Sequence, residues 1–371
     1  MKLQDEKLKY QIALTLIPGI GDILGKNLVS YCGSPEAVFR EKKSRLEKIP
    51  GIGSVLAQSI ANSSVMQRAE EETAFINKHK ISTYFFTEQD YPHRLKHCED
   101  SPLLLYYKGN GNLNHERILA VVGTRHATDY GKKICEEIIE RLAPLDVCIV
   151  SGLAYGIDIC AHKSALKNNL STIAVLAHGL DMIYPGTHRA AAKKMLDAGG
   201  LLTEFMTGTK PDKENFPSRN RIVAGMCDAV LVIESAVKGG AMITANIANS
   251  YNRDVFTIPG RTDDEYSAGC NFLIKKNKAA LVESAEDIAF DLGWENKEDG
   301  KKKKPSQLAI FNELKEDEKA LVNLLQKNGK LPIDSICQRA NMTMSKAAAS
   351  LLTLEFQGIV RSLPGKIYQM A

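Results

Sequence analysis

Short runs of apolar residues alternate with helical patterns through the middle of the chain. Each run has the length of a buried strand and is followed by a stretch of about 10–20 residues with helical spacing. The runs lie at residues 118–123, 146–152, 171–179, 201–205, 229–235 and 254–260. Buried strands that alternate with helices form right-handed crossover units. The pattern therefore predicts an α/β fold with a doubly wound, mostly parallel sheet.

The N-terminal region has a different pattern, which contains an internal repeat. Residues 16–21 (LIPGIG) and residues 48–53 (KIPGIG) each precede a helical stretch. Glycines here allow a tight turn and expose backbone N–H groups at a helix start, where a phosphate can bind. The repeat predicts a helix-hairpin-helix (SAM-like) domain over residues 1–80. Few basic residues flank the two turns, so contact with DNA and contact with protein both stay open.

The C-terminal region predicts a linker and a small third domain. Residues 291–316 are rich in charge and have no apolar period, as in linkers. Residues 317–371 show three short helical patterns and then a two-stranded wing, which is the outline of a winged helix. Its third helix offers only Lys346 as a base, so we do not expect it to read DNA bases. The Rossmann-like sheet domain then spans residues 81–290.

Composition indicates a globular protein and leaves its ligand open. The 371 residues are 44% hydrophobic and 25% charged, with a net charge of +4. A nucleic-acid surface would therefore have to be a local basic patch. The eight cysteines are scattered without a CxxC pair, as in reduced cytosolic proteins. No segment approaches the roughly 20 apolar residues of a membrane span. We expect a cytoplasmic protein with no metal, no cofactor and no membrane span.

Glycines, hydroxyls and cations gather where the predicted strands end, which is where ligands bind in open α/β sheets. Backbone N–H groups at helix starts attract anions there. Residues 216–221 (FPSRNR) add an aromatic ring for a stacked base and forked cations for its phosphates. Alone, this hexapeptide fits a solvated turn equally well. We predict a polyanion groove with the following nucleic-acid-binding residues: Gly123, Arg125, Ser151, Gly152, Lys213, Phe216, Arg219, Asn220, Arg221, Lys238, Gly239, Gly240 and Thr244.

An enzymatic function would depend on a different set of residues, namely Asp158, His162, His178, Asp181 and Glu204. They show no nucleophile, base and orienting group in sequence, and no complete cofactor motif is present. We therefore predict no catalytic residue. The alternative is a nucleotide-processing hydrolase such as a phosphoribohydrolase, but residues 238–246 (KGGAMITAN) lack the glutamate of its PGGxGTxxE loop. A third possibility is a protein-interaction scaffold with vestigial DNA sites.

Together these motifs resemble the DNA-processing protein A (DprA/Smf) family. The resemblance covers about residues 84–290 and rests on residues 123–125 (GTR), 151–158 (SGLAYGID), 179–181 (GLD), 216–221 (FPSRNR), 239–244 (GGAMIT) and 258–260 (IPG). It implies a non-enzymatic protein that binds and shields single-stranded DNA, helps to load RecA recombinase in natural transformation, and forms a homodimer through its sheet domain.

By motif, the resemblance also implies which residues contact the DNA. These are Arg125, Lys213, Phe216, Arg219 and Arg221, while Gly152 and Gly240 would let the backbone approach closely. It assigns no residue to RecA or to the dimer interface.

Overall fold

The structure, a computed structural model, describes residues 2–61, 64–294, 314–363 and 365–370. The chain divides into two units, Met1–Ala285 and Glu286–Ala371. Within the predicted linker at residues 291–316, residues 295–313 lie outside the described residues.

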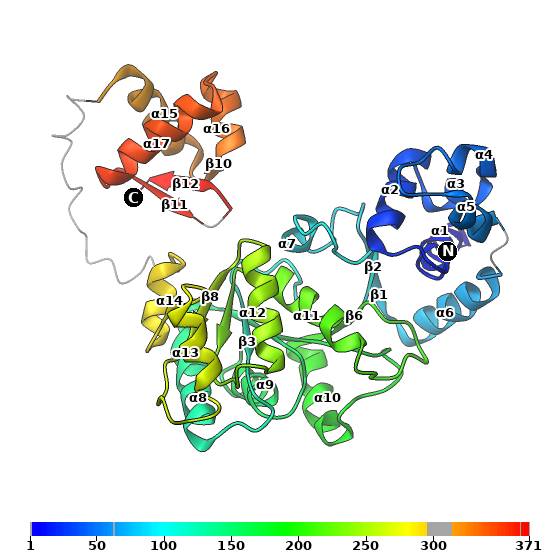
Figure 1. The fold of residues 1–371 in the computed structure, drawn as a ribbon, viewed down its shortest axis with the longest axis horizontal. Helices are drawn as coiled ribbons and strands as arrows, with labels where there is room; N and C mark the ends of the chain where they lie inside the picture. The colour runs from blue at the N-terminus through cyan, green and yellow to red at the C-terminus, as the bar shows by residue number, and fades with distance from the viewer. Residues whose placement is uncertain (1, 62–63, 295–313, 364, 371) are drawn as a thin grey trace. The chain divides into compact units, whose positions relative to one another are not determined.

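One mixed sheet organises the first unit, with the strand order β1-β2-β6-β5-β4-β3-β7-β8-β9 (Figure 1). Its strands are β1 (Ser82–Phe85), β2 (Leu104–Gly109), β3 (Ile118–Val122), β4 (Cys148–Ser151), β5 (Thr172–Val175), β6 (Gly199–Thr203), β7 (Ala229–Val232), β8 (Asp254–Thr257) and β9 (Ala280–Leu281). Strands β3 to β9 pair in parallel. Strands β1 and β2 add an antiparallel edge next to β6. The predicted doubly wound, mostly parallel sheet is confirmed.

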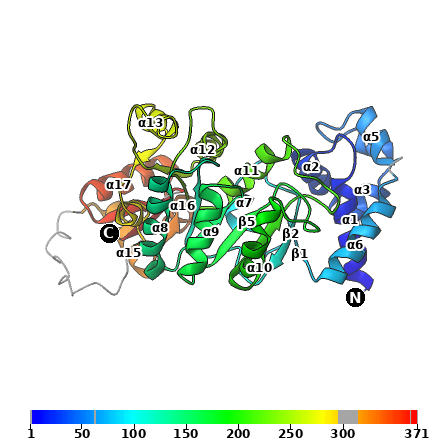
Figure 2. The same cartoon turned by 90° about the horizontal axis from the view of Figure 1, so that it is seen from below.

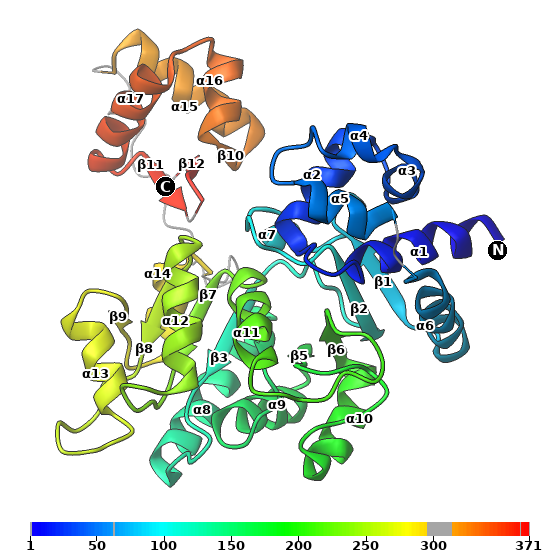
Figure 3. The same ribbon diagram turned by 45° about the vertical axis from the view of Figure 1, so that its right-hand side comes forward.

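Helices cover both faces of this sheet. One layer contains α8 (Asp129–Leu142), α9 (Ile157–Lys167) and α10 (Arg189–Ala198), which Figure 2 shows in a row. The other contains α11 (Asn215–Gly225) and α12 (Gly240–Ser250), which lie side by side (Figure 3). Every residue of β3, β4, β5 and β7 is buried, as expected for parallel strands between two helical layers. The first unit also contains α7 (His93–Lys96) and α13 (Ala268–Lys275), and α14 (Ala285–Asp291) begins at the boundary between the two units.

The direction of the winding reverses beside β3. From β3 the chain proceeds to β4, β5 and β6 on one side, and it then returns to β7, which pairs with the other edge of β3. Right-handed crossovers in opposite directions place their helices on opposite faces. The loops after β3 and β7 therefore separate at a topological switch point, which is the usual ligand site of such sheets.

The N-terminal helices form the predicted helix-hairpin-helix pair. They are α1 (Lys2–Thr15), α2 (Asp22–Cys32), α3 (Pro35–Arg40), α4 (Lys43–Leu46), α5 (Ser54–Ala61) and α6 (Met66–His79). The two turns interlock, because a Cβ at Gly19 would lie 2.8 Å from Leu56 and a Cβ at Gly51 would lie 2.8 Å from Leu24. Both glycines have a positive φ. A larger residue would therefore meet strain and a close contact at either turn.

The first hairpin docks on the sheet domain of the same chain. Asp22, at the start of α2, accepts hydrogen bonds from the Leu103 N–H (2.8 Å) and from Nη2 of Arg221 (3.0 Å). A Cβ at Gly25 would lie 2.3 Å from Cδ1 of Leu103. The start of this helix thus carries an acidic side chain that is already bound to protein, which disfavours a phosphate there.

The second unit contains the predicted winged helix. Its elements are α15 (Glu316–Asn328), β10 (Leu331–Pro332), α16 (Ile333–Ala340), α17 (Met344–Phe356), β11 (Val360–Leu363) and β12 (Ile367–Met370). The strands form an antiparallel sheet in the order β10-β12-β11. Across the described ranges, no helix combines the length and the hydropathy that a membrane crossing requires.

Candidate nucleic-acid interface

A cavity of about 460 Å³ opens at the carboxyl ends of β3 and β7. Its walls come from the loops after β3, β4, β6 and β7 and from α11 and the start of α12. Most of the site residues predicted from the sequence line it, namely Gly123, Arg125, Gly152, Lys213, Phe216, Arg219, Asn220, Gly239, Gly240 and Thr244. The switch point therefore gathers loops that lie far apart in the sequence.

Two exposed cations stand at this cavity without an acidic partner. Arg125 and Lys213 are exposed, and neither forms an ion pair within the described part of the chain. The Arg125 guanidinium lies 5.2 Å from the centroid of the Phe216 ring. A cation over an aromatic face is attracted to it, so the ring holds Arg125 in place while its N–H donors stay available to a ligand.

Arg219 forms the floor of the cavity. Its side chain is buried, and its Nη1 donates hydrogen bonds to the carbonyls of Gly152 (2.5 Å) and Val175 (2.8 Å). Its Nε donates to Oδ1 of Asn220 (3.0 Å). Burial lowers the pKa of Arg219, and the Asp158 carboxylate opposes that shift. Within the described residues Nη2 makes no hydrogen bond, so one donor of the fork remains for a ligand.

Asp158, in the first turn of α9, supplies the counter-charge to Arg219. Its carboxylate lines the cavity, is buried, and accepts a hydrogen bond from the Ala154 N–H (3.3 Å). Burial raises the pKa of Asp158, and Arg219 lowers it. With these two charges opposed, Arg125 and Lys213 give the cavity its net positive charge. The sequence alone did not reveal this role, because an acidic residue in the first turn of a helix is an ordinary N-terminal preference.

Glu234 fastens the loop that carries Arg125. Its buried carboxylate accepts hydrogen bonds from the N–H (2.9 Å) and the hydroxyl (2.5 Å) of Thr128. Its carbonyl accepts a hydrogen bond from the Thr124 N–H (2.6 Å). The loop after β3 is thus tied to the end of β7 on both sides of Arg125. The sequence signal for this role was an acidic residue directly after a buried strand, and the predicted site did not include it.

The start of α12 offers free backbone donors to the cavity. Gly239 is the N-cap of this helix, and no side chain caps it. A Cβ at Gly240 would meet nothing within 4 Å, so the approach to the helix start is open. Uncapped N–H groups together with the helix dipole form an anion site.

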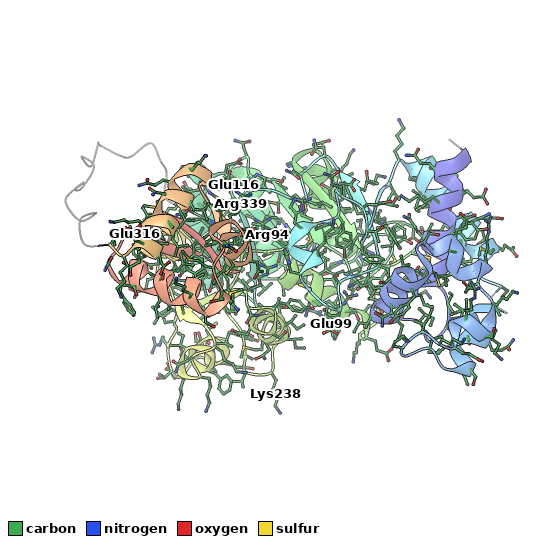
Figure 4. All side chains as sticks on the ribbon, turned by 90° about the horizontal axis from the view of Figure 1, so that it is seen from above. Arg94, Glu99, Glu116, Lys238, Glu316 and Arg339 are labelled. Carbon is green, nitrogen blue, oxygen red and sulfur yellow. The ribbon has the colours of Figure 1, made fainter. Side chains whose placement is uncertain are left out.

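Two of the predicted site residues point elsewhere. The Ser151 hydroxyl donates to the Val121 carbonyl (2.6 Å) and is fully buried. It therefore joins β4 to β3, and the expectation that it faces an anion is corrected. Lys238 is exposed but does not line the cavity, and its side chain points away from the ribbon (Figure 4).

Arg221 is the third predicted residue outside the cavity, because it belongs to a buried ion cluster. It binds the carboxylates of Asp22 and Glu204 and the carbonyl of Asp100. Burial raises the pKa of Glu204 to about 7, although Arg221 lowers it. Residues two apart on a helix do not share a face, so Arg219 and Arg221 diverge. The expectation that both arginines face one groove is therefore corrected.

The five residues considered for hydrolysis are not gathered at one place. Only Asp158 lines the cavity described above. Burial lowers the pKa of His162 to about 3, so its ring is neutral. Glu204 belongs to the buried ion cluster, His178 forms a hydrogen bond with the carbonyl of the adjacent Gly179, and Asp181 accepts one from the Gly208 N–H.

Three protein families match separate stretches of the chain. The family described as DNA recombination-mediator protein A matches residues 82–293. The DprA winged helix domain matches residues 305–366, and the SAM-like helix-hairpin-helix tandem matches residues 12–63.

Similar proteins extend over most of the sequence. Protein Smf of Synechocystis sp. is 32% identical over 97% of this chain and 98% of its own length. DNA processing protein DprA of Streptococcus pneumoniae is 41% identical over 56% of this chain and 73% of its own. The X-ray structure of that pneumococcal protein superposes with a TM-score of 0.64 at 33% identity and covers 76% of this chain and 97% of that one. A structure describing the single-stranded DNA binding mode of Helicobacter pylori DprA superposes with a TM-score of 0.52 at 30% identity, covering 56% and 94%.

Proposed function

Because the chain belongs to the DNA recombination-mediator protein A (DprA/Smf) family, we propose that it binds single-stranded DNA in the cavity between β3 and β7 and helps to load RecA recombinase. The observation that carries the proposal is the Arg125 guanidinium, which is exposed, forms no ion pair within the described residues, and lies 5.2 Å from the centroid of the Phe216 ring at the cavity. A phosphate there would meet a forked cation, and a base that takes the place of a guanidinium over Phe216 would meet an aromatic ring.

The surrounding groups fit the backbone of a nucleic acid. Lys213 adds a second exposed cation, and the open start of α12 adds backbone donors and a favourable dipole. These contacts address phosphates, which carry no sequence information. Binding should therefore show little sequence preference. Single strands are favoured because only their bases are free to stack on Phe216.

The proposal includes two protein partners. One is RecA, onto which the bound strand would be passed, and the other is a second copy of this chain, joined through the sheet domain. RecA filament formation on strands coated with single-strand-binding protein, with and without this protein, tests the first. Light scattering of the full chain tests the second, with a monomer at all concentrations contradicting it.

The binding itself is tested by fluorescence anisotropy with single-stranded and duplex oligonucleotides of equal length. We expect tighter binding to the single strand and a steep loss of affinity between about 50 and 200 mM salt, because bound phosphates release counterions. Equal affinity for both forms, or binding indifferent to salt, would contradict the proposal. A parallel assay for nucleoside monophosphate hydrolysis tests the hydrolase alternative. Release of the free base would support that alternative.

A matched pair of lysine variants locates the binding site. Lys213→Ala removes a cation of the cavity and should reduce both the affinity and its salt dependence, by a slope of about 0.7 for one phosphate contact. Lys167→Ala removes an exposed lysine from the last turn of α9, the end opposite to the cavity. This control should bind like the wild type.

A further inference from the structure

A second, smaller cavity adjoins the first. It has a volume of about 70 Å³ and shares Arg125, Gly152, Ala154 and Phe216 with the larger one. Arg125 and Phe216 thus separate two compartments that a single extended ligand could occupy together.

The smaller cavity differs from the larger one in its chemistry. Apart from Arg125, the described residues that line it include no lysine or arginine, and its only other titratable side chains are two tyrosines and His178. Burial lowers the pKa of His178, so this ring adds no positive charge at neutral pH. The compartment does not suit a phosphate, whereas its aromatic and apolar lining suits a flat ring.

Tyr155 and Tyr184 give this compartment two half-exposed rings. Each side chain belongs to a residue that is 47% exposed. Tyr155 lies in the loop between β4 and α9, and Tyr184 lies in the loop between β5 and α10. Rings of this size are usually buried in a core or at an interface, and two of them on separate loops at one cavity point to a stacking ligand.

Buried histidines contact the Tyr155 ring and the backbone that carries Tyr184. The Tyr155 ring packs edge-on against His188, with centroids 4.9 Å apart and an interplanar angle of 70°. His188 is itself fixed by a hydrogen bond between its Nδ1 and the Leu153 carbonyl (2.9 Å). The Tyr184 N–H donates to Nε2 of His178 (3.3 Å). A ring whose loop is already fixed loses little freedom when a base stacks on it.

We infer that Tyr155 and Tyr184 stack an unpaired nucleobase, the one that follows the base on Phe216 along the same DNA strand. This inference rests on the proposed function. Its ground is that the two compartments share Arg125 and Phe216 as lining residues, so a strand with a phosphate at Arg125 could place its next base in the smaller compartment. A duplex base already has partners on both faces, so the compartment selects single strands.

The test measures binding of the full-length Tyr155→Ala/Tyr184→Ala variant to two oligonucleotides of equal length. One is oligothymidylate, and the other has abasic sites in place of the bases, so that it offers phosphates alone. We expect the affinity for oligothymidylate to fall about tenfold or more, as for lost base stacking. The affinity for the abasic strand and the salt dependence should not change. Equal losses on both strands, or wild-type affinity for oligothymidylate, would overturn the inference.

Conservative variants keep the test independent of folding. Tyr155→Phe and Tyr184→Phe retain both rings, so they should bind oligothymidylate like the wild type, whereas loss of affinity in both would show that the hydroxyls, not stacking, matter. Tyr31→Ala removes a tyrosine of α2 that is 63% exposed and should have no effect. Wild-type binding by Arg125→Ala would sink the proposed function, whereas wild-type binding by the double alanine variant alone would sink only this inference.

Discussion

The cavity and the buried ion cluster both receive an arginine from the same turn of α11, but their cations have opposite environments. At the cavity, Arg125 and Lys213 are exposed and without acidic partners in the described residues. In the cluster, Arg221 is enclosed by the carboxylates of Asp22 and Glu204 and the carbonyl of Asp100. An unpaired exposed cation remains available to a phosphate, whereas an enclosed one joins two parts of the protein.

A short motif can therefore contribute to two different surfaces. Arg219 and Arg221 are separated by one residue, and the helix turns them to different sides. One forms the floor of the cavity, and the other binds the start of α2 in the helix-hairpin-helix domain. Variants at the two positions should therefore fail in different assays.

The largest effect is expected for Arg221→Met. Removing this guanidinium leaves carboxylates buried without their cation, which costs about 3–5 kcal/mol of unfolding free energy. Urea denaturation measures the loss, and Arg221→Met/Glu204→Gln should recover part of it by removing an unpaired charge. The loss of single-strand affinity should stay below that of Arg125→Ala. Unchanged stability would show that the cluster does not hold the two domains together.

Arg125→Ala should produce the opposite result. Loss of a charge-assisted contact to phosphate costs about 1.5–3 kcal/mol of binding free energy. The unfolding free energy should change by no more than about 0.5 kcal/mol, because the side chain is exposed. Titration of a labelled single strand measures the first effect. Arg125→Lys retains the charge without the forked geometry, so its affinity should lie between those of the wild type and Arg125→Ala. Wild-type affinity for Arg125→Ala would show that this residue is not at the site.

Gly152→Ala should displace the Arg219 side chain that forms the floor of the cavity. The added Cβ would lie 1.8 Å from Nη1 of Arg219, so the guanidinium must move and lose its hydrogen bond to the Gly152 carbonyl. We expect a loss of about 1–3 kcal/mol in stability together with weaker strand binding. Gly240→Ala is the matched control for stability, because its Cβ meets nothing within 4 Å. Thermal unfolding that is equal for both variants would contradict this explanation of the glycine.

The smallest effect is a pH dependence confined to the cluster. The pKa of Glu204 rises from 4.5 to about 7 on folding, so the folded state holds this proton more tightly than the unfolded state. The stabilisation is complete below pH 4.5 and is lost as the pH rises through 7, by about 1 kcal/mol between pH 6 and pH 8. Urea denaturation across this range measures it. Glu204→Gln should remove the pH dependence of the unfolding free energy. A wild-type unfolding free energy that increases with pH, when that of Glu204→Gln does not, would contradict the raised pKa of Glu204.

The sequence was sufficient for the fold because buried parallel strands have a simple pattern. The apolar runs predicted β3 to β8, and the ends of parallel strands meet at one edge, so the loops of Gly123, Gly152 and Gly240 could be brought together before the structure was known. Strands β1 and β2 were not among the predicted runs, and they pair antiparallel at the edge of the sheet.

The directions of individual side chains could not be predicted in the same way. Arg221 finds Asp22, which lies 199 positions away in the sequence. The Ser151 hydroxyl donates a hydrogen bond to the neighbouring strand and not to a ligand. Such choices depend on the phase of a helix and on partners that only the folded chain brings near, whereas the gathering of loops depends on topology alone.

Helix α11 also connects the cavity floor to the N-terminal domain. Arg219 and Arg221 are separated by one residue in this helix, so a single helical turn connects the cavity floor to the contact with Asp22 of α2. Coupling of this kind is reciprocal at equilibrium. If a strand bound at Arg219 changes the free energy of the contact between Arg221 and Asp22, then breaking that contact changes the affinity for the strand by the same free energy.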